Sequence, residues 1–142
     1  MAKRNAKAVW EGDLKGGAGT MEFGSGAFKG AYSAASRFEE GTGTNPEELI
    51  GAAHAGCFSM AFSADLAKAG FSPKRVSTEA AVHLDRDGAG FSITKVVLST
   101  RGEVPGIDEA KFREIADGAR QNCPVSRALA GVQVEVQATL AG

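Results

Sequence analysis

The segment from Thr44 to Gly70 constrains the fold more than any other part of this chain. It reads TNPEELIGAAHAGCFSMAFSADLAKAG, and no residue between Glu48 and Asp65 is formally charged. Thr44 or Asn45 can cap the first backbone amides of a helix, and the proline that follows suits the first helical position. The glycine at the far end is typical of a helix stop. We therefore expect one long helix, apolar nearly all round, which belongs in the interior of a fold.

Four side chains of this helix carry polar chemistry: Glu47, Glu48, His54 and Cys57. At about 100° per residue, Glu48 points to the side opposite Cys57, whereas Glu47 comes to about 80° from it. Glu47 is therefore the better partner for chemistry at Cys57. His54 lies one turn before the cysteine, and such a histidine is more often a satisfied core residue than a ligand.

Alternating apolar residues predict strands on both sides of the long helix. Before it, we expect strands at 6–11, 20–23 and 27–33. After it, we expect a hairpin of 76–84 and 91–103 with a bulge between Ile93 and Val96, and a closing strand at 132–140. Asp108 can cap a second helix over 109–121, and Pro124 can begin a short third helix through Ala130. This order of elements indicates an α+β fold, and the length indicates one domain over residues 1–142.

Composition excludes several classes of function. The chain has 16 Lys and Arg against 17 Asp and Glu, so it lacks the excess of positive charge that nucleic acid or an anionic membrane would require. The uncharged run from 49 to 64 is shorter than a membrane span and contains a histidine, which favours a buried helix. The N-terminal residues do not resemble a signal peptide, so we expect a cytoplasmic location.

The two cysteines, Cys57 and Cys123, are a pair of free thiols, a metal pair or a redox pair. A thiol buried in an apolar helix is inert unless a positive group stabilises its thiolate. Arg37, just upstream of the long helix, is the nearest candidate in sequence, and Glu47 can orient its guanidinium. Cys123 lies beside the start of the predicted short helix, where a thiolate is favoured, so it could condense with a sulfenic acid on Cys57.

Other interpretations of these residues stay open. The cysteines could be two inert core thiols, because cysteine is among the most buried residue types. Arg37 and Glu47 could form an ordinary surface ion pair. A zinc site built from His54, Cys57 and Cys123 is conceivable, although the closely spaced ligand pairs of zinc motifs are absent.

The residues from Arg37-Phe38-Glu39-Glu40-Gly41 through NPEELIGAAHAGCFSMA resemble the signature of the OsmC family, the osmotically inducible protein C family. The likeness continues through GFSITK at 90–95, VPGID at 104–108 and CPVS at 123–126. The sister group of organic hydroperoxide resistance proteins typically has a tyrosine in place of His54, and its active-site arginine comes earlier than Arg37. The chain therefore resembles the OsmC branch.

This resemblance implies an OsmC-like fold with antiparallel sheets around a long buried central helix, in an intertwined homodimer with two active sites at the subunit interface. It implies a thiol-dependent peroxidase of the bacterial cytoplasm that reduces organic hydroperoxides in oxidative or osmotic stress. Cys57 would be the peroxidatic cysteine, Cys123 the resolving cysteine, and Arg37 and Glu47 the activating pair. A disulfide would form between the cysteines, and an external thiol, such as a dithiol lipoyl protein, would reduce it.

No metal or organic cofactor is required for this cycle. The apolar side chains of Phe58, Met60 and Phe62 would suit an alkyl hydroperoxide if they line the substrate pocket. The competing interpretation is a dimeric, stress-induced binding protein without enzymatic activity, in which both thiols are merely buried.

Overall fold

The chain is described over residues 1–142 by a computed structural model, and it is an α+β protein with two three-stranded sheets and one long helix, α2 (Pro46–Lys68). Two compact units divide the chain, Met1–Leu49 and Ile50–Gly142, and the division falls inside α2. The single domain expected from the sequence stays a prediction.

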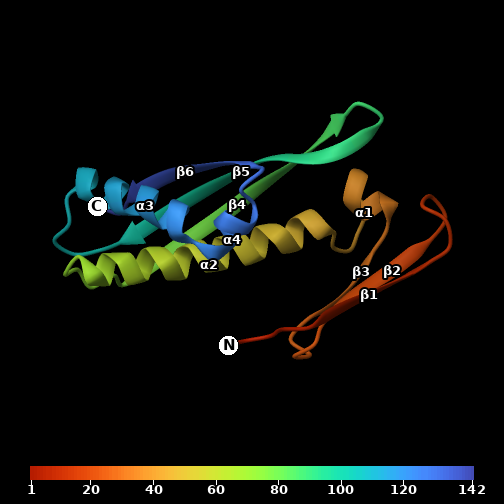
Figure 1. The fold of residues 1–142 in the computed structure, drawn as a ribbon, viewed down its shortest axis with the longest axis horizontal. Coiled ribbons are helices and arrows are strands. Elements are labelled where there is room, and N and C mark those ends of the chain that lie inside the picture. The colour runs from red at the N-terminus through yellow and green to blue at the C-terminus, as the bar shows by residue number, and fades with distance from the viewer. The chain divides into compact units, whose positions relative to one another are not determined.

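The first unit is built on the antiparallel sheet β1–β2–β3 (Figure 1). Its strands are β1 (Ala6–Glu11), β2 (Ala18–Phe23) and β3 (Lys29–Tyr32), so all three strands predicted before the long helix are confirmed. The rings of Trp10 and Tyr32 lie 5.3 Å apart, centroid to centroid, across this sheet. Gly19 sits between them, and a side-chain carbon there would come within 2.6 Å of the Tyr32 ring.

A short helix that the sequence analysis did not predict, α1 (Ala34–Phe38), follows β3. Ser33 caps it, and the hydroxyl of Ser36 accepts a hydrogen bond from the Ser33 amide (2.8 Å). The same hydroxyl donates to the carbonyl of Thr44 (2.7 Å), and the side-chain amide of Asn45 donates to the carbonyl of Ser36 (3.0 Å). These bonds fix α1 against the residues that lead into α2.

Helix α2 begins and ends where its sequence signals predict. The Asn45 side chain accepts the backbone N–H of Glu48 (2.8 Å), so Asn45 rather than Thr44 is the cap. Gly70 has a φ of +94°, a conformation that costs a glycine little and lets the chain leave the helix.

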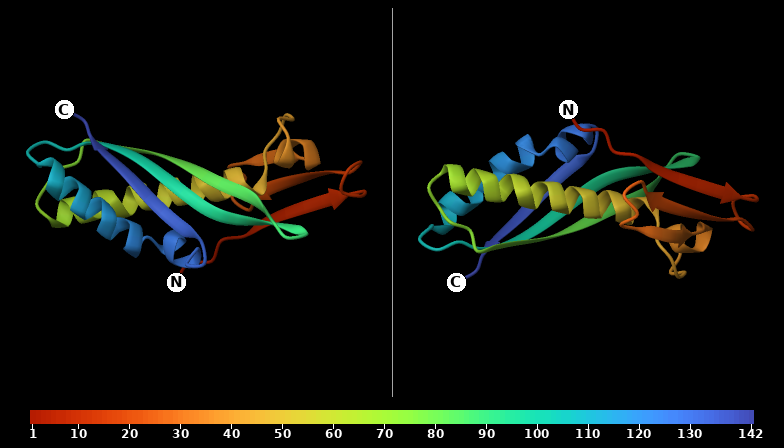
Figure 2. Two further views of the ribbon diagram at one scale, coloured as in Figure 1. Left: turned by 90° about the horizontal axis from the view of Figure 1, so that it is seen from above. Right: turned by 90° about the horizontal axis from the view of Figure 1, so that it is seen from below.

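The second unit carries the sheet β4–β5–β6, of β4 (Arg75–Asp87), β5 (Gly90–Glu103) and β6 (Gln133–Leu140). The predicted bulge is present, because His83 pairs with Lys95 and Leu84 with Ile93, which leaves Thr94 as the extra residue. β6 pairs with β5 in parallel, so the expectation of wholly antiparallel sheets is wrong. The physical reason is the crossover through α3 (Glu109–Asn122) and α4 (Pro124–Ala128), which returns the chain to the same end of the sheet (Figure 2).

The core of this unit lies between α2, β5 and α3. Phe58, Phe62 and Leu66 of α2 are fully buried, as are Val96 and Leu98 of β5 and Phe112 of α3. The rings of Phe62 and Phe112 lie 5.0 Å apart. Each such side chain contributes about 1.5–3 kcal/mol on burial, so this cluster holds the helices to the sheet.

Only one face of α2 is covered in the single chain. The buried residues follow one stripe, whereas Ala52, Ala53, Gly56, Met60 and Ala64 form a second stripe that is exposed. The expectation of a helix buried all round is therefore wrong for one chain, because within Ile50–Gly142 the core covers only one side of α2. By length and composition alone, α2 could also cross a membrane, a test that the core helix of a soluble protein passes as well.

Candidate active site

The two cysteines lie together in the second unit. Cys57 is on α2 and partly exposed, whereas Cys123 is fully buried where α3 ends and α4 begins. Both are free thiols, and their side chains are hydrogen-bonded to each other. Residues that are 66 positions apart in the sequence are thus close enough for each thiol to shift the pKa of the other.

The surroundings shift the pKa values of the two thiols in opposite directions. Burial raises the pKa of Cys57, the hydrogen bond with Cys123 raises it further, and the Val125 amide only partly offsets these effects. Burial acts to raise the pKa of Cys123 too. Hydrogen bonds from the Cys57 thiol, from the amide and hydroxyl of Ser126 and from the Val125 amide outweigh it and lower the pKa of Cys123. Within this unit, the thiolate form is therefore favoured more on Cys123 than on Cys57.

Arg37 and Glu47 form a close pair in the first unit. The Nη2 of Arg37 donates to Glu47 Oε1 at 2.7 Å, and its Nε lies 3.1 and 3.3 Å from the two carboxylate oxygens. The Glu47 side chain is 9% exposed and that of Arg37 is 38% exposed. Because the carboxylate is buried and bound at two points, this is not an ordinary surface ion pair. Glu48 is exposed and accepts a hydrogen bond from the Thr44 hydroxyl (2.8 Å).

An apolar hollow of about 290 Å³ lies beside Arg37 in the same unit. Its lining includes the rings of Trp10, Tyr32 and Phe38, and the guanidinium of Arg37 lies 5.4 Å from the Phe38 ring centroid. Phe58 and Phe62 do not line this hollow, because both are fully buried in the core. Met60 is 77% exposed on α2 and does not line it either.

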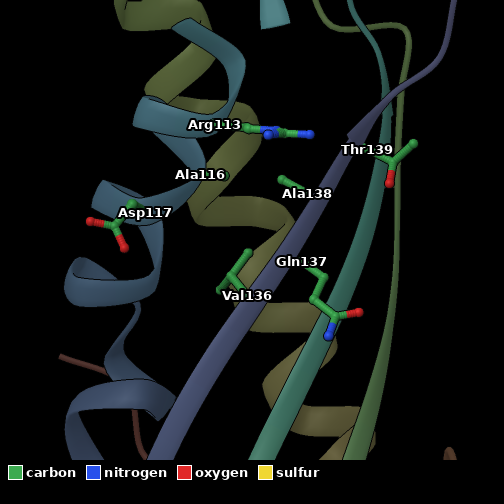
Figure 3. A pocket seen from close by; sticks show the side chains of 7 residues that line it. All are labelled: Arg113, Ala116, Asp117, Val136, Gln137, Ala138 and Thr139. Carbon is green, nitrogen blue, oxygen red and sulfur yellow. The ribbon is translucent and has the colours of Figure 1, made fainter. Parts of the chain in front are cut away.

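A second hollow, of about 430 Å³, lies between α3 and β6 (Figure 3). Its charged residues already have partners on α3, since Arg113 pairs with Glu109 and Asp117 with Arg120. Neither cysteine lines it. It offers no nucleophile, and we assign no reaction to it.

His54 is fully buried, as expected for a core histidine, but its partner could not be read from the sequence. Its Nε2 lies 2.6 Å from the hydroxyl of Ser126, and its Nδ1 has no hydrogen-bond partner. No group of three or more His, Cys, Asp or Glu side chains gathers that could hold a metal ion.

The sequence patterns did not indicate two residues that support the site, Ser36 and Ser126. The Ser33-x-x-Ser36 pattern is a helix-start signal that could have revealed α1 and hence the element that carries Arg37. Ser126 had no such signal, because its contact with His54 joins residues 72 positions apart.

The fold and the paired thiols define the chain as a small α+β protein with a two-cysteine centre. The family model for OsmC-like proteins matches residues 39–137, and the chain therefore belongs to the OsmC family. The chain is 50% identical to a protein of Escherichia coli named peroxiredoxin OsmC, over 89% of each chain. It is 39% identical to an organic hydroperoxide resistance protein of Xanthomonas axonopodis pathovar citri, over 71% of this chain and 69% of that protein.

Solved structures agree on the fold. An OsmC-like protein of unknown function from Vibrio cholerae matches with a TM-score of 0.76 over 97% of this chain and 99% of that chain, at 22% identity. The organic hydroperoxide resistance protein OhrB of Bacillus subtilis matches with a TM-score of 0.72 over 96% of this chain and 98% of that chain, at 28% identity. The recognition of the OsmC family and the α+β, OsmC-like fold class are both confirmed.

Proposed function

We propose that this protein is a cysteine-based thiol peroxidase that reduces organic hydroperoxides, and hydrogen peroxide less well, in defence against oxidative and osmotic stress. The relatives named peroxiredoxin OsmC and organic hydroperoxide resistance protein support the broader part of this proposal, a peroxide-related redox function. The observation that carries the cysteine mechanism is the hydrogen bond between the free thiols of Cys57 and Cys123.

In the first step, the thiolate of Cys57 attacks the distal oxygen of the hydroperoxide. The O–O bond breaks, the sulfur gives up two electrons and becomes a sulfenic acid, and the leaving alkoxide takes a proton to become an alcohol. Cys57 is suited to this step because it is the partly exposed member of the pair.

In the second step, the thiolate of Cys123 attacks the sulfenic sulfur of Cys57. An S–S bond forms, and the hydroxide that leaves is protonated to water. An external dithiol then reduces the disulfide by thiol–disulfide exchange and is itself oxidised. The lowered pKa of Cys123 supports its role as the resolving thiol, because that thiol must be ionised to attack. None of these steps draws on a metal or an organic cofactor.

Ionising Cys57 requires a positive group, because burial raises its pKa. We assign this role to Arg37, with Glu47 as the residue that orients its guanidinium. We propose further that the protein is a homodimer, in which the Arg37–Glu47 pair of one copy serves the thiol of the other.

The exposed stripe of α2 supports an intertwined homodimer. Ala52, Ala53 and Gly56 are small enough to let a second helix approach closely, and Met60 is an adaptable apolar residue. Leaving such a stripe in water costs free energy that a second copy would recover. The expected location is the bacterial cytoplasm, whose reducing conditions would keep both cysteines as thiols between cycles.

One equivalent of cumene hydroperoxide, followed by mass spectrometry, tests the proposal. The expected product is a Cys57–Cys123 disulfide with the loss of two hydrogens and one equivalent of cumyl alcohol. The absence of both a disulfide and a sulfenic acid adduct would overturn the peroxidase and favour the alternative, a dimeric binding protein with inert thiols. Cys123→Ser is the matched variant, which we expect to form the alcohol once and then stop.

A further inference from the structure

The buried pair of His54 and Ser126 has no part in the peroxidase cycle proposed above. His54 is 0% exposed and lies one turn before Cys57 on α2, and Ser126 lies one turn after Cys123 on α4. Only 2.6 Å separates His54 Nε2 from Ser126 Oγ. Each member of this pair is therefore a helical neighbour of one of the two thiols.

The hydroxyl of Ser126 has two possible acceptors for its single proton. One is His54 Nε2, 2.6 Å away, and the other is Cys123 Sγ, one turn earlier in the chain, whose pKa the Ser126 side chain helps to lower. A thiolate carries a negative charge and can only accept, so the proton is better placed on the side of Cys123. The bond to His54 must then run the other way, with Nε2–H donating to Ser126 Oγ.

The unpaired Nδ1 of His54 agrees with this direction. If Nε2 carries the proton of the neutral ring, Nδ1 is a bare acceptor, whereas the other tautomer would bury an N–H without a partner. Buried N–H groups without a partner are the rarer and costlier defect. Burial also lowers the pKa of His54, so the ring stays neutral and acts as a hydrogen-bond donor rather than as a charge.

We propose that His54 is a positioning residue: its Nε2–H, donated to Ser126 Oγ, directs the Ser126 hydroxyl at Cys123 Sγ and so stabilises Cys123 as a thiolate. In the peroxidase cycle, on which this consequence rests, an ionised Cys123 attacks the sulfenic acid of Cys57 without waiting to lose a proton. His54 touches neither substrate nor reacting atom, and it acts through Ser126 alone.

The test measures the ionisation of Cys123 in a Cys57→Ser background, where a single thiol remains. The ultraviolet absorbance of the thiolate is followed against pH and corrected with the Cys57→Ser/Cys123→Ser double variant. We expect Ser126→Ala to raise the titration midpoint by about one pH unit or more, since a hydrogen bond to a charged group is lost. Ser59→Ala is the matched control. It removes a hydroxyl on α2 that is hydrogen-bonded to Thr78, and it should not shift the midpoint.

His54 is tested by two substitutions that differ in one donor. His54→Phe removes the Nε2–H and should raise the midpoint nearly as far as Ser126→Ala does. His54→Gln keeps an N–H donor near the same place, so its titration midpoint should stay close to that of the protein with His54. The His54→Phe/Ser126→Ala double variant should shift no further than Ser126→Ala alone, because one residue acts through the other.

An unchanged midpoint in a folded His54→Phe protein, or additive shifts in the double variant, would overturn the proposal. Nitrogen NMR of the imidazole in the unmutated protein decides the matter even if a variant fails to fold. A proton on Nδ1 instead of Nε2 would also overturn it. No peroxide enters these measurements, so their failure is distinct from a failure of the peroxidase function.

Discussion

The two units of the chain hold different parts of the proposed active site. In Met1–Leu49, the Arg37–Glu47 pair supplies a positive charge beside an apolar, aromatic hollow, without a thiol. In Ile50–Gly142, two thiols are in contact, and no positive side chain is among the groups that shift the pKa of Cys57. The unit with the arginine pair has no cysteine, and in the unit with the cysteines no arginine or lysine acts on the Cys57 thiol. The proposed activity requires both groups, and substitutions in each unit test that requirement.

The largest effect is expected at the nucleophile. Cys57→Ser should lower the turnover of cumene hydroperoxide with a dithiol reductant by at least about a thousandfold, because a serine hydroxyl cannot take the place of a thiolate at this step. Turnover that persists in Cys57→Ser would show that the reaction does not use the thiol pair. Steady-state consumption of the hydroperoxide measures it, and the circular dichroism spectrum shows whether the variant is folded.

Removing the charge should have the next largest effect. Arg37→Ala should lower kcat/KM for the hydroperoxide by about a hundredfold, as the loss of one electrostatic stabiliser typically does. The pH at which the rate is half-maximal should rise, since burial then acts unopposed on the pKa of Cys57. Arg113→Ala, which breaks an exposed ion pair with Glu109 on α3, is the matched control and should leave both unchanged.

If Arg37→Ala slowed the reaction without moving its pH profile, Arg37 would bind substrate but would not ionise the thiol. Arg37→Lys sharpens the distinction, because it keeps the charge but cannot hold Glu47 at two points. We expect it to fall between the alanine variant and the parent protein.

A smaller effect is expected from removing the Ser36 hydroxyl, which holds the helix that carries Arg37. Ser36→Ala removes the hydrogen bond that the Ser36 hydroxyl donates to the Thr44 carbonyl and the one that it accepts from the Ser33 amide, both of which hold α1 in place. Unfolding in urea should show a loss of about 1–3 kcal/mol, because two backbone groups lose a partner. Activity should fall by less than in Arg37→Ala. Ser92→Ala, in the exposed β4–β5 hairpin, is the control, and an unchanged activity in Ser36→Ala would show that α1 does not position Arg37.

The smallest effect is on stability in acid. His54 has a lowered pKa when folded and an ordinary one when unfolded, so below about pH 6.5 the unfolded chain binds more protons. The free energy of unfolding should therefore decrease as the pH falls through this range, by at most about 1.4 kcal/mol per pH unit from this residue. Urea unfolding of His54→Gln at several pH values should show a shallower dependence of the unfolding free energy on pH than the parent protein does. Equal slopes would mean that burial of His54 does not link its protonation to folding.

Much of the fold could be predicted because its signals are local. The cap and stop of α2, the alternation along β4 and the bulge at Thr94 each depend on residues close in sequence, and the structure confirms them. The parallel pairing of β6 with β5 could not be predicted in this way, because alternation along a strand does not tell which direction its neighbour runs.

The site residues show the same difference between local contacts, which the sequence can predict, and long-range contacts, which it cannot. The pairing of Arg37 with Glu47 followed from their nearness in sequence and the need of a guanidinium for a carboxylate. The contact of His54 with Ser126 depends on how α4 meets α2 in three dimensions, and no local pattern encodes it. The sequence also left open whether Phe58 and Phe62 line a pocket or fill the core, since a helix that is apolar nearly all round does not reveal which face meets the sheet.

The parallel crossover has a consequence for the order of events during synthesis. Cys57 emerges from the ribosome early, whereas Cys123 lies in the connection that only β6 closes onto the sheet. Until Gln133–Leu140 has been made and has docked, only the packing of α3 on α2 can hold the second thiol beside the first. A growing chain therefore carries Cys57 for some time before the segment that contains Cys123 is fixed in place by this last strand.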